Sequence, residues 1–276
     1  LGQTIRIFLD EEIPSAAIIS EWRAPDKSLM RGFHMDFLLH FGPSHYNDLF
    51  RCDEPYFSSR GKGNASEFIE KYIENYKKTE GRGLICIPSG NHDMDRMARR
   101  LSQEEMKIAF AFLLTMPGAP FIYYGDEIGM RYIENIPSVE GGYERTGSRS
   151  PMQWNSLPNA GFSMASSDKL YIPIDKDANR PTVEAQISDS DSLYNEVRRL
   201  ISVRKEHKVK ENEYPLCYLR AADEEKILVI INPSDKEHSF SCKYTPDTPI
   251  YSIGGNIHRS EGLINVPPCF AGFYCL

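Results

Sequence analysis

Apolar and polar positions along the first two thirds of the chain form a pattern of strands followed by helices. Almost continuous apolar runs are typical of parallel strands buried on both faces, and they occur at 16–19, 33–39, 83–88 and 120–124. Helical spacing predicts helices at 1–9, 66–78 and 193–201, and a capping box formed by Ser102 and Glu105 opens another helix. Strands that alternate with helices predict βαβ units and a parallel sheet, the α/β class.

The pattern changes after residue 210. Short strands between turn residues are expected at 227–231, 239–241, 249–251 and 270–276, which predicts a small all-β sandwich. We therefore expect two domains, at 1–210 and 211–276. Between 131 and 181 the chain lacks strong periodicity, and a connection of that length is usually functional.

Polar residues with carboxylates follow three of the four predicted parallel strands. They form the short segments 20–22 (SEW), 91–93 (NHD) and 125–127 (GDE). Active sites of parallel barrels gather at the carboxyl ends of the strands, so these segments are candidates for chemistry. Asp36 lies within an apolar strand instead, and we expect a buried carboxylate bonded to the backbone or to an arginine.

Composition narrows the class of protein. The 276 residues include 39 acidic and 32 basic side chains, a net charge of −7, which argues against binding to nucleic-acid phosphates. The most apolar stretch, 108–124, is broken by Pro117, Gly118 and Pro120, so we expect no membrane span. Six cysteines form neither a CxxC pair nor a zinc spacing, which predicts reduced thiols and a cytoplasmic protein.

Several motifs together resemble the alpha-amylase family, glycoside hydrolase family 13. The segments 18–22 (IISEW), 89–93 (SGNHD) and 123–130 (YYGDEIGM) are similar to the ends of its fifth, seventh and eighth barrel strands, in the family's order. The resemblance implies that Glu21 is the general acid/base, a role that requires a carboxyl pKa raised by burial and neighbouring carboxylates. It implies that His92 and Asp93 hold the sugar at the cleavage point, with Asp93 favouring the oxocarbenium-like state.

Two neighbours of that pair complete the predicted site. We expect Asn91 to contact substrate with His92, and Arg96 to contact either the sugar or an acidic neighbour. The aromatic residues Tyr132, Tyr143 and Trp154 are further candidates for lining sugar subsites, although core packing is the commoner fate of a tryptophan.

One branch of the family fits best. The segment 149–154 (RSPMQW) resembles a loop signature of the oligo-1,6-glucosidase and trehalose-synthase branch, and 183–186 (VEAQ) also matches it. That branch usually has Asp after the tryptophan, where this chain has Asn155.

The family's nucleophilic aspartate has no counterpart in the sequence. In the family it ends the fourth strand, in a pattern like Gly-x-Arg-x-Asp, and neither this pattern nor the earlier Asp-x-x-x-Asn-His occurs. A barrel domain needs about 250 residues, whereas about 200 precede the predicted β-domain. We therefore expect the C-terminal half of a (β/α)8 TIM barrel, strands five to eight, followed by a small all-β sandwich.

The resemblance implies part of a retaining α-glycosidase that hydrolyses α-linked oligosaccharides and is inactive alone, since such enzymes use two carboxyl groups about 5 Å apart. A non-catalytic amylase-fold binding or assembly protein, and a transglycosylase or isomerase such as trehalose synthase, remain alternatives. No cofactor is expected, and the sequence leaves calcium undecided. Half of a barrel leaves strand edges unpaired, which predicts self-association or docking with an N-terminal half-barrel.

Overall fold

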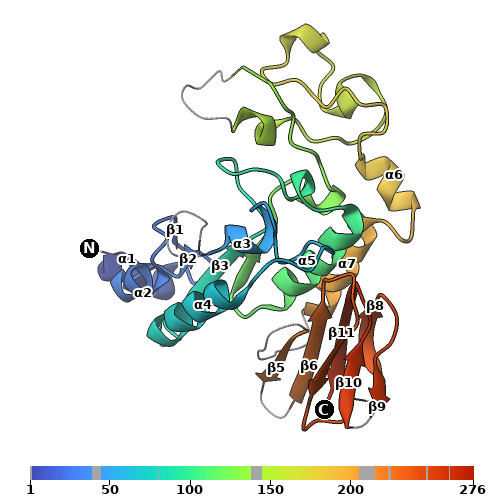
Figure 1. Cartoon of the computed structure of the whole chain (residues 1–276). Coiled ribbons are helices and arrows are strands. Elements are labelled where there is room, and N and C mark those ends of the chain that lie inside the picture. Colours follow the sequence, from blue (N-terminus) through green and yellow to red (C-terminus); the bar gives the residue numbers. More distant parts are fainter. Residues whose placement is uncertain are drawn as a thin grey trace.

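The computed structural model has a mixed α/β architecture and describes residues 2–38, 45–79, 81–137, 145–204, 215–222, 225–246, 248–260 and 262–276. Its helices are α1 (Gly2–Glu12), α2 (Pro25–Ser28), α3 (Asn47–Phe50), α4 (Ser66–Thr79), α5 (Gln103–Thr115), α6 (Val183–Ser188) and α7 (Leu193–Arg204). Figure 1 shows three regions: the first helices and strands on one side, a long connection above them, and antiparallel strands in red below.

The first four strands form the expected parallel sheet. They are β1 (Ile19–Ser20), β2 (Met35–Phe37), β3 (Leu84–Pro88) and β4 (Ala119–Phe121), and their order in the sheet is β1-β2-β3-β4. Every neighbouring pair is parallel, with Ser20 opposite Asp36 and Pro88 opposite Phe121. Because all four strands run the same way, their carboxyl ends lie along one edge of the sheet.

The prediction that the first strand spans 16–19 and is buried on both faces is wrong. Only Ile19 and Ser20 pair with β2, and the Ile19 side chain is 41% exposed. The reason is position: among the described residues β1 has a strand neighbour on one side only, and α1 contributes no buried residue to cover it. An apolar run indicates a strand but does not tell which of its faces is covered.

Helix α5 packs against both the parallel sheet and the C-terminal strands in one core. Its capping box is confirmed, because Ser102 Oγ accepts from the Glu105 N–H at 3.2 Å and the Glu105 carboxylate accepts from the Ser102 N–H at 2.7 Å. Every residue from Met106 to Thr115 is buried, and the cluster around them includes Ile87 of the parallel sheet and Phe273 near the C-terminus. The expected domain boundary at 210/211 lies outside the described residues.

The C-terminal strands form two antiparallel sheets. They are β5 (Leu216–Ala222), β6 (Glu225–Asn232), β7 (His238–Ser241), β8 (Pro249–Ile253), β9 (His258–Ser260), β10 (Leu263–Val266) and β11 (Phe270–Cys275). One sheet has the order β5-β6-β11-β8 and the other β7-β10-β9. A second core joins them, with Ile230 and Phe270 from the first sheet against Ile264 and Val266 from the second. Strands were predicted within β6, β7, β8 and β11, whereas β5, β9 and β10 were not foreseen.

The connection between β4 and α6 contains no strand or α-helix among its described residues. It holds the short 3-10 turns η3 (Asp126–Ile128), η4 (Thr146–Arg149), η5 (Pro158–Gly161) and η6 (Ser167–Lys169), and in Figure 1 most of it extends away from the red strands. Tyr143, a predicted subsite residue, lies outside the described residues. All six cysteines are free thiols. In the described ranges, no helix has both the length and the apolarity that a bilayer crossing demands.

Candidate active site

Ser89 connects the end of β3 to β4 and the segment after it through hydrogen bonds. Its N–H donates to the Phe121 carbonyl at 2.7 Å, and its hydroxyl donates to Asp126 Oδ2 at 2.7 Å while accepting from the Tyr123 N–H at 2.9 Å. A glycine fits the next position, because a Cβ on Gly90 would lie 2.9 Å from the same Asp126 oxygen and 3.0 Å from Arg51 Nη2. The turn that carries Asn91, His92 and Asp93 follows Gly90 directly.

Asp93 is the best-anchored carboxylate of the predicted site. Its backbone N–H donates to Asn91 Oδ1 at 2.8 Å, so Asn91 shapes the turn. Its Oδ1 accepts from Arg145 Nη1 at 2.5 Å and from Arg149 Nη2 at 2.9 Å, while Oδ2 faces His92 Nε2 at 3.6 Å. Two guanidinium groups on one oxygen fix the direction of the Asp93 carboxylate. The His92 ring is exposed at the open edge.

Sequence reasoning did not assign these two arginines to the site. Arg149 opens the RSPMQW motif, which was a signal for a family branch but gave no role for the side chain. No sequence motif marked Arg145, because Arg145 and Asp93 are 52 residues apart in the sequence and come together only in the fold. The hydroxyl groups of Tyr123 and Tyr124 hold the same loop, donating to the carbonyls of Ser148 and Ser150 at 3.2 and 2.8 Å.

Arg96 lies beneath the site rather than in it. Its side chain is fully buried, and Nη1 donates to Asp126 Oδ1 at 3.0 Å and to the Tyr124 carbonyl at 2.5 Å. The guanidinium group also lies over the Tyr123 ring, 4.6 Å from its centroid. Of the two predicted partners, sugar or acidic neighbour, the structure shows the acidic neighbour. Arg96 therefore stabilises the end of β4 and supports the tyrosines above it.

Glu21 follows β1 at the same edge of the sheet. One strand, β2, separates β1 from β3, so the two strand ends are about 10 Å apart across the sheet. The Glu21 side chain is exposed and forms no hydrogen bond or ion pair with the part of the chain that the structure describes. The burial expected for a general acid is therefore not supplied by these residues.

A hollow of about 440 Å³ opens beside Arg149. Its wall includes the aromatic side chains of Trp154, Phe162 and Tyr171, all about half exposed or more, together with Glu127. Burial raises the pKa of the Glu127 carboxyl, and its Oε2 atom is buried without a partner among the described residues. The hollow thus offers flat apolar faces, which suit a ligand with ring faces, whereas the Glu127 oxygen is buried beneath its wall. Trp154, a predicted subsite residue, is about half exposed and lines this hollow.

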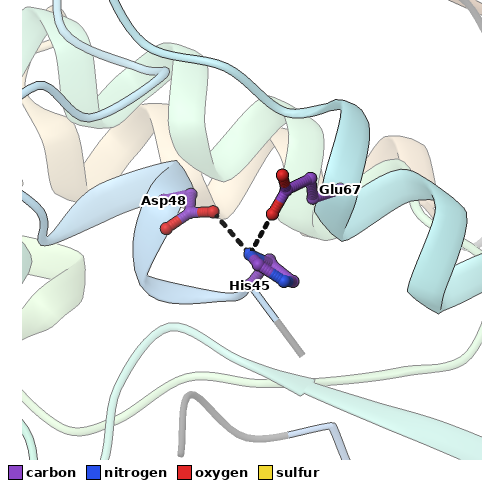
Figure 2. A group of neighbouring side chains, drawn as sticks. All are labelled: His45, Asp48 and Glu67. Carbon is purple, nitrogen blue, oxygen red and sulfur yellow. Dashed lines mark hydrogen bonds and ion pairs between the residues drawn. The ribbon is translucent and has the colours of Figure 1, made fainter. Parts of the chain in front are cut away.

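A second group of ionisable side chains lies on the connection from β2 to α4. Figure 2 shows His45 between Asp48 of α3 and Glu67 of α4. The imidazole Nδ1 is 3.0 Å from Asp48 Oδ2 and 2.7 Å from Glu67 Oε2. Calcium prefers oxygen ligands alone, so an imidazole with two carboxylates suits a transition metal better. At these distances, however, the carboxylates contact the imidazole directly, as hydrogen-bonded pairs do.

The comparison with known families decides the identity. The alpha-amylase catalytic domain matches residues 33–212, which is well over half of the chain. This chain belongs to the alpha-amylase family. The predicted resemblance is confirmed. Strands β2, β3 and β4 fall within the matched range, whereas β1 and Glu21 precede it.

Curated relatives of this family member include glucosidases and trehalose synthases. The chain is 28% identical over 220 residues to the oligo-1,6-glucosidase of Parageobacillus thermoglucosidasius, covering 63% of this chain and 38% of the relative. It is 40% identical over 109 residues to the trehalose synthase/amylase TreS of Mycolicibacterium smegmatis, covering 38% of this chain and 17% of the relative. The chain thus spans well under half the length of these relatives.

Solved structures show the same fold. Amy13B of Eubacterium rectale superposes with a TM-score of 0.70 at 20% identity, covering 99% of this chain and 55% of that protein. A mutant of trehalulose synthase MutB gives a TM-score of 0.76 at 19% identity, with 99% and 57% covered. At these identities the likeness establishes the alpha-amylase type of barrel fold for the family member.

Proposed function

We propose that this chain is the part of a retaining α-glycosidase that carries its general acid/base, Glu21, and its transition-state stabiliser, Asp93. The single observation that carries the proposal is that both residues follow parallel strands whose carboxyl ends share one edge of the sheet. Active sites of parallel barrels lie at that edge. In this proposal β1 to β4 are strands five to eight of a (β/α)8 barrel, within a domain at 1–210, and residues 211–276 form a β-sandwich domain.

The chemistry needs two carboxylates in different roles. Glu21 donates its proton to the glycosidic oxygen as the bond to the sugar breaks, while a nucleophilic carboxylate forms the covalent glycosyl-enzyme. Glu21 then takes a proton from water, which releases the sugar and restores the enzyme. Asp93 and His92 face the ring hydroxyls and stabilise the positive charge that develops on the sugar, and Asn91 holds their turn.

The nucleophile comes from polypeptide outside this chain. Three observations support a partner half-barrel beside β1. Glu21 is exposed, Ile19 is 41% exposed, and helix α1 has no buried residue. Such a partner would bury Glu21 and supply the neighbouring carboxylate that its acid role requires. We call this chain together with the polypeptide that carries the nucleophile the complete enzyme.

The proposed substrates are α-linked oligosaccharides. One sugar ring sits over Asp93 and His92, and the hollow lined by Trp154 and Tyr171 receives a neighbouring ring. The aromatic faces of this hollow pack on the apolar faces of sugar rings. The free state of all six cysteines supports a cytoplasmic location.

A second candidate reaction, isomerisation, uses the same residues. It is favoured by the 39–40% identity of one segment to proteins named trehalose synthase/amylase TreS, a name that includes a synthase activity beside an amylase activity. The covalent intermediate is shared, so the two reactions differ in whether water or a retained sugar attacks it. Product analysis after incubation of the complete enzyme with maltose separates them: glucose indicates hydrolysis, and trehalose indicates isomerisation.

The test of the acid/base assignment uses the Glu21→Gln variant of the complete enzyme. We expect a loss of roughly 10²–10⁴ in kcat for substrates with a poor leaving group. The leaving group of α-glucosyl fluoride needs little protonation. The rate of its first step, in which the glycosyl-enzyme forms, should therefore be retained. Equal losses on both substrates, or no loss, would show that Glu21 is not the general acid.

A further inference from the structure

The carboxylate of Asp36 is fully buried in the parallel sheet and accepts four hydrogen bonds. Its Oδ1 accepts from the backbone N–H of Trp22 at 3.0 Å and of Phe37 at 2.9 Å. Its Oδ2 accepts from the Ala24 N–H at 3.0 Å and from the Ser28 hydroxyl at 2.7 Å. The expectation of a buried carboxylate bonded to backbone is confirmed, and two of its donors belong to the turn that follows β1.

Asp36 contacts the backbone on both sides of Glu21. On one side Ser20 lies opposite Asp36 in the β1–β2 ladder, and on the other side the Trp22 N–H binds the Asp36 carboxylate. Glu21 therefore stands between two attachments to the same residue. A backbone fixed on both sides limits the directions in which its side chain can point.

Other contacts of this turn are the bond from the Trp22 N–H to Ser20 Oγ at 3.2 Å and the Arg31 guanidinium group, 4.7 Å from the Trp22 ring centroid. The Trp22 side chain is 51% exposed, and Arg23 has a φ of 62°, in the left-handed region that non-glycine residues avoid. Strained conformations persist only where the surroundings fix them. The two N–H groups that flank Arg23, on Trp22 and Ala24, both end on Asp36, so this carboxylate fixes the strained residue.

We propose that Asp36 is a positioning residue, which sets the direction of the Glu21 carboxyl toward the glycosidic oxygen. This inference rests on the proposed function, because it acts through Glu21. Asp36 itself is buried and touches no substrate. Asp36→Asn keeps the size of the side chain but turns one oxygen into an amide group that cannot accept, so a turn N–H loses its partner. The turn then relaxes and Glu21 leaves its reactive direction.

The first experiment needs only this chain. Amide hydrogen exchange, read by NMR, should show slow exchange for the N–H groups of Trp22 and Ala24, although both lie in an exposed turn outside the strands. Fast exchange of both amides in the unmodified chain overturns the proposal, and this result does not depend on whether any variant folds.

The second experiment compares leaving groups in the complete enzyme. With Asp36→Asn we expect kcat/KM for maltose, which reports the first step, to fall by roughly 10–100-fold, a share of what general acid catalysis contributes. We expect kcat/KM for α-glucosyl fluoride to change less than about threefold. Ser28→Ala is the matched control, since it removes one bond to Asp36 Oδ2 but leaves both turn amides bonded. It should keep both activities within about threefold of the unmodified enzyme.

The outcomes separate this inference from the proposed function. Equal losses on both substrates in Asp36→Asn, beside a selective loss in Glu21→Gln, mean that Asp36 is merely structural and overturn the inference. No selective loss in Glu21→Gln overturns the proposed function itself. If Asp36 acts only through Glu21, the double variant should be no slower on maltose than Glu21→Gln alone, and a further loss contradicts the inference.

Discussion

Arg149 binds the turn that carries Asp93 at two points. Its Nη2 donates to Asp93 Oδ1 at 2.9 Å, and its Nε donates to the His92 carbonyl at 2.8 Å. A loop that begins beyond β4 thus fixes the orientation of a carboxylate that follows β3. This contact links the long connection to the proposed sugar site.

Arg149→Gln should weaken catalysis by the complete enzyme. Loss of a charge-assisted hydrogen bond costs about 1.5–3 kcal/mol, which predicts a drop in kcat/KM of roughly 10–100-fold. The control is Arg131→Gln, because Arg131 pairs with Asp177 at 2.6 Å in the same connection and does not contact the site. Steady-state kinetics on maltose measure both variants, and equal activities would contradict the role of Arg149.

Asp126→Asn should destabilise the chain strongly. The variant leaves the fully buried Arg96 guanidinium without its counter-charge, and breaking a buried ion pair in this way costs about 3–5 kcal/mol. Urea unfolding followed by circular dichroism measures the change in the free energy of unfolding. Glu74→Gln is the control, since Glu74 forms its ion pairs with Lys71 and Lys78 on the surface and should give no measurable change. A loss below about 1 kcal/mol for Asp126→Asn would contradict this.

Glu105 gives a stability contribution that depends on pH. Burial raises the pKa of its carboxyl, but the hydrogen bonds from the Ser102 and Ser59 backbone outweigh burial, and the net pKa is lowered. A carboxyl with a lowered folded-state pKa stabilises the fold above its unfolded pKa, about 4.3. The contribution is lost as the pH falls through the lower folded value.

We therefore expect Glu105→Gln to be less stable than the unmodified chain at pH 7. A capping interaction contributes about 0.5–2 kcal/mol. The difference in the free energy of unfolding should shrink when the pH is lowered below about 4.3. Urea titrations at pH 7 and pH 3.5 measure it, and a difference that stays constant or grows on acidification would contradict the capping role of the charged carboxylate.

The uncovered edge of the sheet should make the isolated chain associate. Ile5, Phe8 and Ile19 are each more than 40% exposed, and among the described residues β1 has a strand neighbour on one side only. Size-exclusion chromatography with light scattering at micromolar concentration should show dimers or larger species, and the double variant Ile5→Glu with Phe8→Glu should reduce them. Leu157→Glu, on an exposed residue of the long connection, is the control. A well-behaved monomer for the unmodified chain would contradict the predicted association.

Local signals in the sequence predicted the local parts of the fold well. These parts depend on residues that are close together in the sequence. They are the capping box of α5, the amphipathic α4 and the order of strands and helices. The predicted burial of the first strand was wrong because burial depends on which neighbours cover a strand, and periodicity alone carries no information about them. The pattern could show that β1 is a strand but not that Ile19 is exposed.

The candidate site divides in the same way. Glu21, His92 and Asp93 could be named from motifs, because each stands at a fixed place after a strand. The role of Arg145 could not be foreseen, because its contact with Asp93 forms only when the connection folds back across the edge of the sheet. For Arg96 the sequence predicted either a sugar or an acidic neighbour as its partner. Its burial against Asp126 depends on the packing of β3 against β4.

The most direct test of the central claim is the activity of this purified chain on p-nitrophenyl α-glucoside. The proposed function assigns the acid/base and the stabiliser to this chain and the nucleophile to polypeptide outside it, so we predict no release of nitrophenol above the buffer background. Robust turnover that Glu21→Gln abolishes would contradict the account, because it would mean that residues 1–276 contain a complete catalytic pair.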